Sequence, residues 1–309
     1  MIEDSIQLGD AVEHRGVSIV PLFPRRDPQA EYVTLEEALP LGFRVSEVDA
    51  AGSVPELVAV NPLDTPVLLY DGEELVGAKQ NRILNVTVLV APGSEIRIPV
   101  SCVEQGRWHA CAAGFAPARH AASPELRRRK AELLGADPLA RGLAQSVVWE
   151  EVAAKAGRHG VRSPTAAAVD IYRSREEDLA ARRGVFPLLA GQAGAVLALG
   201  DERLCLDYLS RPAAFARLYP KLLDGYLLDA LEHDGTRARP ERPAELVAAL
   251  DALPRRRARS AGIGEDLRLA GAGIVASGLV LDGELVQLSA FTSEAERPRT
   301  RVARPSRRR

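Results

Sequence analysis

The sequence predicts an α+β protein in which a β-rich N-terminal region (a meander or sandwich-like sheet), a helical middle and C-terminal β-hairpins form one layered core. Three observations support this class. Short apolar runs alternate with turn signals up to Trp108, apolar residues follow a helical spacing after Pro124, and hairpin patterns return near the C-terminus. Because the late strands must pair with something, we expect the two β-regions to share the core.

The first elements are a strand over Val17–Phe23 and a short helix that opens at Thr34. The segment Pro-Arg-Arg-Asp-Pro follows the strand and ends it. Thr34 and Glu37 have the spacing of a capping box, in which each side chain bonds the backbone N–H of the other residue. The helix is therefore expected to include Ala38 and Leu39.

The next region is predicted to be a series of short strands. The turn signals between them are Asn61-Pro62, Asp71-Gly72 and Pro92-Gly93. Asp71-Gly72 predicts a hairpin over Pro66–Gly77, and Ala91–Glu95 is expected to join two later strands. The predicted strands are Arg44–Val48, Leu57–Val60, Val67–Tyr70, Ile83–Val90 and Ile96–Val103.

The second half of the chain is predicted to mix helices with hairpins. Apolar residues at helical spacing predict helices over Pro124–Leu134, Leu139–Ala156, Pro164–Arg182, Pro212–Glu232 and Pro243–Leu253. Two apolar runs split by Asp201-Glu202-Arg203 predict a hairpin of Gly194–Gly200 with Leu204–Leu209. Further strands are expected over Leu267–Leu281 and Glu284–Phe291, with Asp282-Gly283 as the turn between them.

The chain is predicted to form one α+β domain over residues 1–296, with a β-rich part (1–122) and a mixed helical and β part (123–296). Residues 297–309 are expected to be a disordered tail, since they hold seven arginines, two prolines and no acid. Subtracting these seven charges from the formal charge of −2 leaves −9 on the body of the chain. A nucleic-acid partner is therefore not expected, although the tail could contact polyanions.

Composition predicts a cytoplasmic protein without a membrane partner. The three cysteines, Cys102, Cys111 and Cys205, show no paired short spacing, so neither a disulfide framework nor a zinc knuckle is expected. No apolar run approaches the roughly 20 residues that cross a bilayer. The five histidines lack metal-ligand spacing, and no phosphate-binding or dinucleotide loop identifies a cofactor.

A dense group of polar and reactive side chains among the predicted strands marks the candidate site. It lies in Leu69–Asn85 and Ile98–Trp108. A half-buried β-region normally alternates polar and apolar residues, so this density favours a functional site over a plain sheet.

Cys102, Glu104 and Glu74 are the candidate catalytic residues. A thiolate at Cys102 would need a nearby cation such as Lys79 or Arg107, whereas a buried cysteine is more often an inert part of the core. Glu104 could serve in acid–base or cation-binding work, together with one of Glu73 and Glu74, because those two point to opposite faces of a strand. The alternative is that these carboxylates are solvated or paired with arginines.

The candidate ligand-binding residues carry cationic, amide or aromatic groups. Cations and amides suit the binding of phosphate, carboxylate or a nucleobase edge, and a tryptophan can stack on a flat ligand. A solvated turn and core packing are the alternatives that remain open. The candidates are Lys79, Gln80, Asn81, Arg82, Asn85, Arg107, Trp108, Gln145 and Trp149.

These motifs resemble a bacterial family named for its association with ADP-ribosylglycohydrolases and rhodanese-phosphatases. The resemblance covers most of the chain. It implies a soluble prokaryotic protein without an established activity, and a genomic setting near ADP-ribose or phosphoester metabolism. The residues that carry it are Glu74, Gly77–Arg82, Asn85, Pro99–Glu104, Arg107-Trp108, Gln145-Ser146, Trp149, Gln192–Gly194, Asp207 and Lys221–Tyr226.

Two hypotheses about function follow from the sequence. In the first, the chain is a pocket protein that binds or acts on a small anionic or nucleotide-like ligand, such as an ADP-ribose derivative. In the second, the chain is a non-catalytic interaction module whose polar cluster is a buried network that fixes the strands. An open cleft around Lys79, Glu104 and Arg107 would favour the first.

Overall fold

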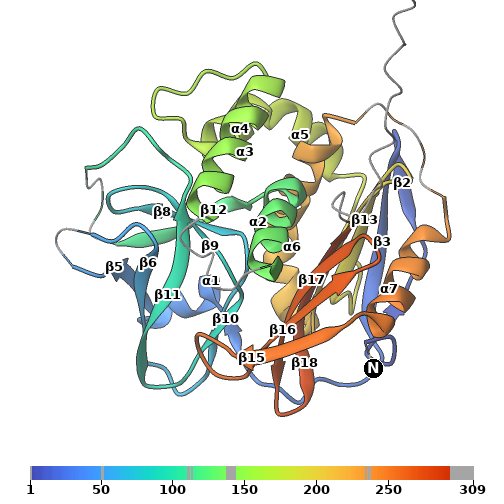
Figure 1. The fold of residues 1–309 in the computed structure, drawn as a ribbon, viewed down its shortest axis with the longest axis horizontal. Helices are drawn as coiled ribbons and strands as arrows, with labels where there is room; N and C mark the ends of the chain where they lie inside the picture. Colours follow the sequence, from blue (N-terminus) through green and yellow to red (C-terminus); the bar gives the residue numbers. More distant parts are fainter. Residues whose placement is uncertain are drawn as a thin grey trace, which may run out of the picture.

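A computed structural model describes residues 2–49, 52–109, 112, 114–136, 144–233, 235, 237 and 239–292. Within these residues it contains seven α-helices and eighteen β-strands, which confirms the α+β class and the β-rich N-terminal region (Figure 1). None of the described helices combines the length and the apolarity that crossing a bilayer requires. The predicted tail over 297–309 and Cys111 lie outside the described residues.

The largest sheet joins the two ends of the chain. Its N-terminal strand β3 pairs antiparallel with β13, so that Val17 lies opposite Leu199 and Leu22 opposite Gly194. The two β-regions therefore share one core, as predicted. The spatial order is β1 (Ile6–Leu8), β3 (Val17–Pro24), β13 (Gly194–Leu199), β14 (Arg203–Leu209), β18 (Glu284–Thr292), β17 (Ile274–Leu281), β16 (Glu265–Gly271) and β15 (Arg255–Arg259), with β2 (Val12–His14) also paired to β3.

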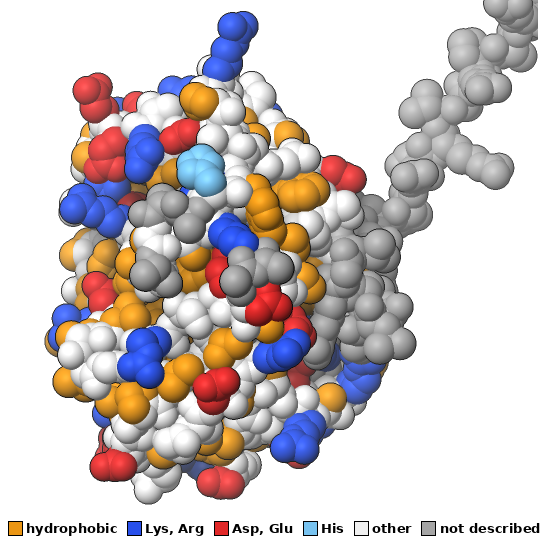
Figure 2. Space-filling view, turned by 90° about the vertical axis from the view of Figure 1, so that its left-hand side faces the viewer, with side chains coloured by type: hydrophobic (Ala, Val, Ile, Leu, Met, Phe, Trp, Pro, Cys, Tyr) orange, Lys and Arg blue, Asp and Glu red, His pale blue; other side chains and the backbone are white. Residues whose placement is uncertain are grey.

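Two smaller sheets hold the rest of the N-terminal region. The six-stranded sheet has the order β12 (Phe115–Ala121), β8 (Glu73–Gly77), β9 (Arg82–Leu84), β11 (Ser94–Cys102), β6 (Glu56–Asn61) and β5 (Arg44–Glu47). The three-stranded sheet has the order β10 (Val88–Val90), β7 (Val67–Leu69) and β4 (Val33–Thr34). Figure 2 shows the side of the molecule at the left of Figure 1, where basic, acidic and apolar side chains are interspersed.

Helices fill the space between the sheets. The helices α2 (Pro124–Ala136) and α6 (Pro212–Ala230) lie between the six-stranded sheet and the largest sheet (Figure 1). Helix α6 packs on β12 as well as on β13 and β14, so it joins the two β-regions. The other helices are α1 (Leu35–Ala38), which a 3-10 turn extends over Leu39–Leu41, α3 (Ala144–Arg158), α4 (Ala168–Ser174), α5 (Glu176–Arg183) and α7 (Arg242–Ala252).

Several short signals in the sequence have the predicted structures. Thr34 and Glu37 form the capping box at the start of α1. Asp282 and Gly283 have φ angles of 50° and 86°, which a two-residue hairpin turn requires, and they join β17 to β18. The strands β13 and β14 form the predicted hairpin.

The predicted hairpin over Pro66–Gly77 is wrong, although the chain does turn at Asp71-Gly72. Strand β7 joins the three-stranded sheet, whereas β8 joins the six-stranded sheet. The turn is held from outside, because Lys130 of α2 pairs with Asp71 and also donates to the carbonyl of Leu84. The predicted strand Ile83–Val90 is likewise divided into β9 and β10, which belong to different sheets.

The predicted helix over Pro164–Arg182 is two helices, α4 and α5, divided at Arg175. The Arg175 side chain donates to the carbonyl of His159 at 2.7 Å, which holds the break. Three acids, Glu176, Glu177 and Asp178, favour a new helix start because they face the positive end of the helix dipole. Of the helix predicted over Leu139–Ala156, the first residues, up to residue 143, lie outside the described residues.

A buried polar hub at Asp207 of β14 ties the layers together. Its carboxylate accepts hydrogen bonds from Arg127 (2.6 and 2.8 Å), Tyr226 (2.6 Å), Tyr70 (2.7 Å) and Ser289 (2.9 Å). Burial alone would raise the pKa of Asp207, but the Arg127 charge and these hydrogen bonds lower it to about 2. The hub connects the largest sheet with α2, α6 and the end of β7.

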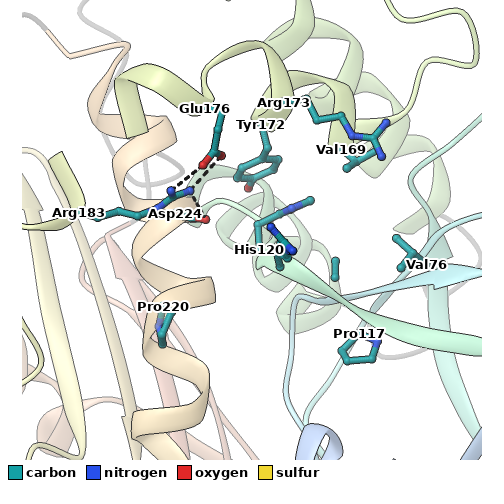
Figure 3. A pocket seen from close by; sticks show the side chains of 12 residues that line it. Val76, Pro117, His120, Val169, Tyr172, Arg173, Glu176, Arg183, Pro220 and Asp224 are labelled. Atoms are coloured by element: carbon teal, nitrogen blue, oxygen red, sulfur yellow. Dashed lines mark hydrogen bonds and ion pairs between the residues drawn. The ribbon is translucent and has the colours of Figure 1, made fainter. Parts of the chain in front are cut away.

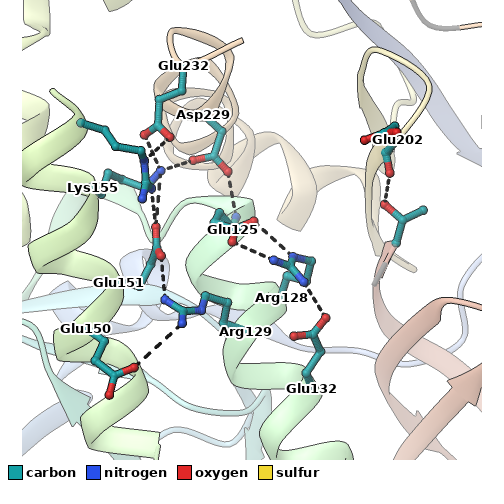
Figure 4. A network of polar contacts seen from close by, with 12 residues as sticks. Glu125, Arg128, Arg129, Glu132, Glu150, Glu151, Lys155, Glu202, Asp229 and Glu232 are labelled. Carbon is teal, nitrogen blue, oxygen red and sulfur yellow. Dashed lines mark hydrogen bonds and ion pairs between the residues drawn. The ribbon is translucent and has the colours of Figure 1, made fainter. Parts of the chain in front are cut away.

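A second ionic network joins α2, α3 and α6 (Figure 4). Lys155 donates to Asp229 at 2.6 Å and to Glu232 at 2.8 Å, and Arg158 also contacts Glu232 at 2.6 Å. Burial raises the pKa of Glu232, but the hydrogen bond with His159 and the charge of Lys155 outweigh it and lower the pKa to about 2.

We expect the free energy of unfolding to fall as the pH is lowered from about 4.5 towards 2. The pKa values of Glu232 and Asp207 lie near 2 in the folded chain, below their ordinary values of 4.5 and 3.8. The ionised carboxylates therefore stabilise the fold fully above their ordinary pKa values, and this stabilisation is lost as the pH falls towards 2. Urea denaturation at a series of pH values measures this dependence. Glu232→Gln should flatten it, whereas Glu177→Gln on an exposed position should not; an unchanged slope in Glu232→Gln would contradict the assignment.

Candidate functional site

Four of the predicted site residues, Gln80, Asn81, Glu104 and Arg107, meet in one buried hydrogen-bond network. The Glu104 carboxylate accepts from Arg107 at 2.7 Å, from the backbone N–H of Asn81 at 3.2 Å and from Thr165 at 3.1 Å. The Gln80 amide donates to the Glu104 carbonyl at 3.0 Å. Burial raises the pKa of Glu104, but the Arg107 guanidinium and the other donors outweigh it, so the pKa is lowered.

Arg107 holds this network in place. Besides Glu104, its guanidinium donates to the carbonyls of Gly77 (3.4 Å), Ala78 (2.8 Å) and His109 (3.1 Å) and to Asn81 Oδ1 (3.1 Å). Gly77 has a φ of 132°, and a Cβ there would lie 2.4 Å from the carbonyl oxygen of Gly114. A glycine is therefore required where β8 ends beside the guanidinium.

Cys102 lies in a buried position where helix α3 meets β11. The Gln145 amide accepts from the Cys102 N–H at 2.7 Å and donates to its carbonyl at 2.9 Å, so it fixes the strand end. Burial raises the pKa of the Cys102 thiol, which favours the unreactive protonated form. Nucleophilic catalysis by Cys102 stays a prediction, and this environment argues against it. Trp149 of the same helix is partly buried.

Lys79, Arg82 and Trp108 form a second group, which Arg82 links to the Glu104 network through Gln80. Trp108 is 49% exposed, and Lys79 Nζ and the Arg82 guanidinium carbon lie 5.5 and 5.8 Å from the centroid of its ring. Arg82 itself is fully buried, donates to Gln80 at 2.8 Å and lies 4.0 Å from a Glu47 oxygen. This group is not part of the cleft described below.

Asn85 and Glu74 lie apart from these groups. The Asn85 N–H donates to the Pro99 carbonyl at 3.0 Å, and its side chain is buried. Glu74 of β8 is buried, and its Oε2 lies 2.8 Å from Nε2 of His120 on β12. Glu74 and Glu104 thus have different partners, and no described hydrogen bond joins them.

A cleft with two adjoining parts opens beside helix α4. The first part lies between β12 and the helices α4, α5 and α6, and the second lies between the end of β8, the Glu104 network and α4. The first part has a volume of about 740 Å³ and the second about 620 Å³, and they share Val76, Val169 and Arg173. Figure 3 shows the first part, in which His120 and Tyr172 face the cleft from β12 and α4. Asn81, Glu104 and Arg107 line the second part, so one edge of the buried network faces open space.

Three arginines lie around the first part of the cleft. Arg183 is engaged, because it donates to Asp224 at 2.6 Å and to Glu176 at 2.7 Å (Figure 3). Arg173 has a side chain that is 74% exposed, and it makes a weak surface ion pair with Asp170 at 3.3 Å. Arg119 on β12 is exposed as well. The two exposed arginines can turn towards a ligand without breaking a buried contact.

The sequence prediction missed the residues of the first part, among them Arg119, His120 and Arg173. Strand β12 was not predicted, because Pro117 and adjacent polar residues interrupt its apolar pattern. Among the residues that the structure describes, no group of three or more His, Cys, Asp or Glu side chains could hold a metal ion.

Comparison with known proteins identifies the family of the chain. No curated protein and no solved structure matches it significantly. The model of the ARG and Rhodanese-Phosphatase-superfamily-associated Protein domain matches residues 5–291, which include both parts of the cleft and the Glu104 network. The chain therefore belongs to the family of the ARG and Rhodanese-Phosphatase-superfamily-associated Protein domain.

Proposed function

We propose that this protein binds a small anionic, nucleotide-like ligand, such as an ADP-ribose derivative, in the cleft between β12 and the helices α4 to α6. The observation that carries the proposal is the pair of exposed arginines, Arg119 and Arg173, beside a cleft whose first part measures about 740 Å³. Volumes of about 300–1,000 Å³ are typical of small-molecule sites. The family description, which names association with rhodanese-phosphatases, supports a phosphate-bearing ligand.

Guanidinium groups suit such a ligand because they bind phosphate oxygens through paired hydrogen bonds. Arg173 borders both parts of the cleft, so it can reach a phosphate in either. Arg107 in the second part is fixed by its contacts with Glu104 and Asn81, and a fixed donor loses little entropy when it binds. The proposal assigns the binding of the anion to these arginines and to Asn81 rather than to Lys79, Gln80 or Arg82.

Calorimetric titration with ADP-ribose tests the proposal. Arg119→Ala and Arg173→Ala should each weaken binding roughly tenfold, because each removes one charge-assisted contact. Arg256→Ala on strand β15 is the matched control, since that arginine is exposed and outside the cleft lining. Binding that is absent from the unmodified protein, or that is equal in all three variants, would contradict the proposal.

A second candidate function is a non-catalytic interaction module. The observation that favours it is that Gln80, Asn81, Glu104 and Arg107 satisfy one another inside the fold. Such a network can fix a fold without any ligand. Failure of ADP-ribose to bind, together with a large loss of stability on removal of Arg107, would favour this candidate.

A further inference from the structure

The cleft contains a histidine that a buried carboxylate holds in place. Glu74 Oε2 lies 2.8 Å from His120 Nε2, and the side chains are 2% and 6% exposed. The imidazole stacks on Tyr172 with 3.7 Å between the ring centroids. These contacts fix the plane of the ring and engage one nitrogen, while Nδ1 makes no hydrogen bond to the described residues and the residue lines the cleft.

The Glu74 carboxylate is buried on the side away from His120 as well. Its second oxygen, Oε1, is buried without a hydrogen-bond partner among the described residues, and so is the hydroxyl of Ser123. Both residues line a small cavity of about 20 Å³. That space is sufficient for one water molecule, which could donate to the carboxylate and bond the hydroxyl. Carboxylate, imidazole and open cleft thus form a continuous line from the interior to the ligand site.

We infer that His120 is the general base of a hydrolytic site, which cleaves a phosphodiester or phosphoanhydride bond of the ligand in the cleft. This inference rests on the proposed function, because that function brings the phosphate beside Arg119 and Arg173. A histidine whose second nitrogen is held by a carboxylate is oriented for proton transfer, and the carboxylate stabilises the imidazolium that forms.

The reaction balances with water as the only co-reactant. The water oxygen forms a bond to phosphorus while its proton passes to Nδ1 of His120. The bond from phosphorus to the leaving oxygen breaks, and that oxygen takes the electron pair and then a proton from solvent. His120 returns its proton to solvent, and Arg119 and Arg173 offset the charge that develops on the phosphoryl oxygens.

Hydrolysis of bis(p-nitrophenyl) phosphate and of ADP-ribose, with kcat and KM determined separately, tests the inference. His120→Gln should lower the turnover rate by about 10²–10⁴-fold while calorimetry shows ADP-ribose binding within about twofold of the unmodified protein. Glu74→Gln should lower kcat while KM for ADP-ribose stays within about twofold, because it removes the carboxylate that orients the His120 ring without removing a group that contacts the ligand. Arg256→Ala should change neither.

Two results would overturn the inference. The first is an unmodified protein that binds ADP-ribose but hydrolyses neither compound, which leaves the proposed function intact. The second is turnover that His120→Gln leaves unchanged. Circular dichroism establishes whether His120→Gln and Glu74→Gln are folded. If His120→Gln does not fold, His120→Asn replaces it. An unmodified protein that does not bind ADP-ribose would instead refute the proposed function.

Discussion

Replacing Asp207 with alanine is expected to lower the free energy of unfolding by about 3–5 kcal/mol, the range for removal of one partner from a buried ion pair. The substitution leaves the fully buried Arg127 guanidinium without its two hydrogen bonds to the carboxylate, at 2.6 and 2.8 Å. It also removes the acceptor for the Tyr70 and Tyr226 hydroxyls. Because the hub touches α2, α6 and the largest sheet, the loss should affect the whole fold.

Urea denaturation followed by circular dichroism measures this loss. Asp201→Ala is the control, because Asp201 makes an exposed ion pair with Arg239 at 3.1 Å. Exposed pairs contribute about 0–1 kcal/mol, so the control should remain near the unmodified protein. An Asp207→Ala variant that loses less than about 1 kcal/mol would show that the hub does not hold the layers together.

Replacing Arg107 with alanine is expected to lower the free energy of unfolding by about 3 kcal/mol. The change leaves the Glu104 carboxylate without its cation and removes the donor for the carbonyls of Gly77 and Ala78. We expect the low end of the range for buried ion pairs, because the network borders the cleft and water can reach part of it.

The same urea experiment, with Arg97→Ala as the control, tests this value. Arg97 pairs with Glu56 at 3.0 Å on the surface, so its removal should cost little. If Arg107→Ala keeps its stability but loses affinity for ADP-ribose, then Arg107 serves the ligand and not the fold. Loss of both is the result that the geometry predicts, because Arg107 belongs to the network and also lines the cleft.

The features that the sequence predicted correctly are encoded over a few neighbouring residues. The capping box at Thr34 and Glu37 and the turn at Asp282-Gly283 depend on local backbone bonds, which a short motif specifies. The ion pair of Glu104 with Arg107, an alternative that the sequence left open, spans three positions and is likewise local. The sharing of one core by both β-regions followed from the need of the late strands for partners.

The features that were missed depend on contacts between distant segments. Strands β7 and β8 separate at Asp71 because Lys130, 59 positions later, holds the turn. His120 contacts Glu74, which lies 46 positions earlier in the chain. His120 belongs to β12, which was not predicted because Pro117 interrupts its apolar pattern. No local pattern in one sequence indicates such pairings, so the residues of the first part of the cleft could not be predicted. Three residues of the second part, Asn81, Glu104 and Arg107, were among the predicted site residues.

The most direct test of the central claim is a crystal structure of the protein with bound ADP-ribose. We predict electron density for the ligand in the cleft, with phosphate oxygens within hydrogen-bond distance of Arg119 or Arg173 and with the His120 ring facing the diphosphate. Ligand density beside Lys79 and Trp108 instead, or a cleft that stays empty at saturating ADP-ribose, would contradict the account.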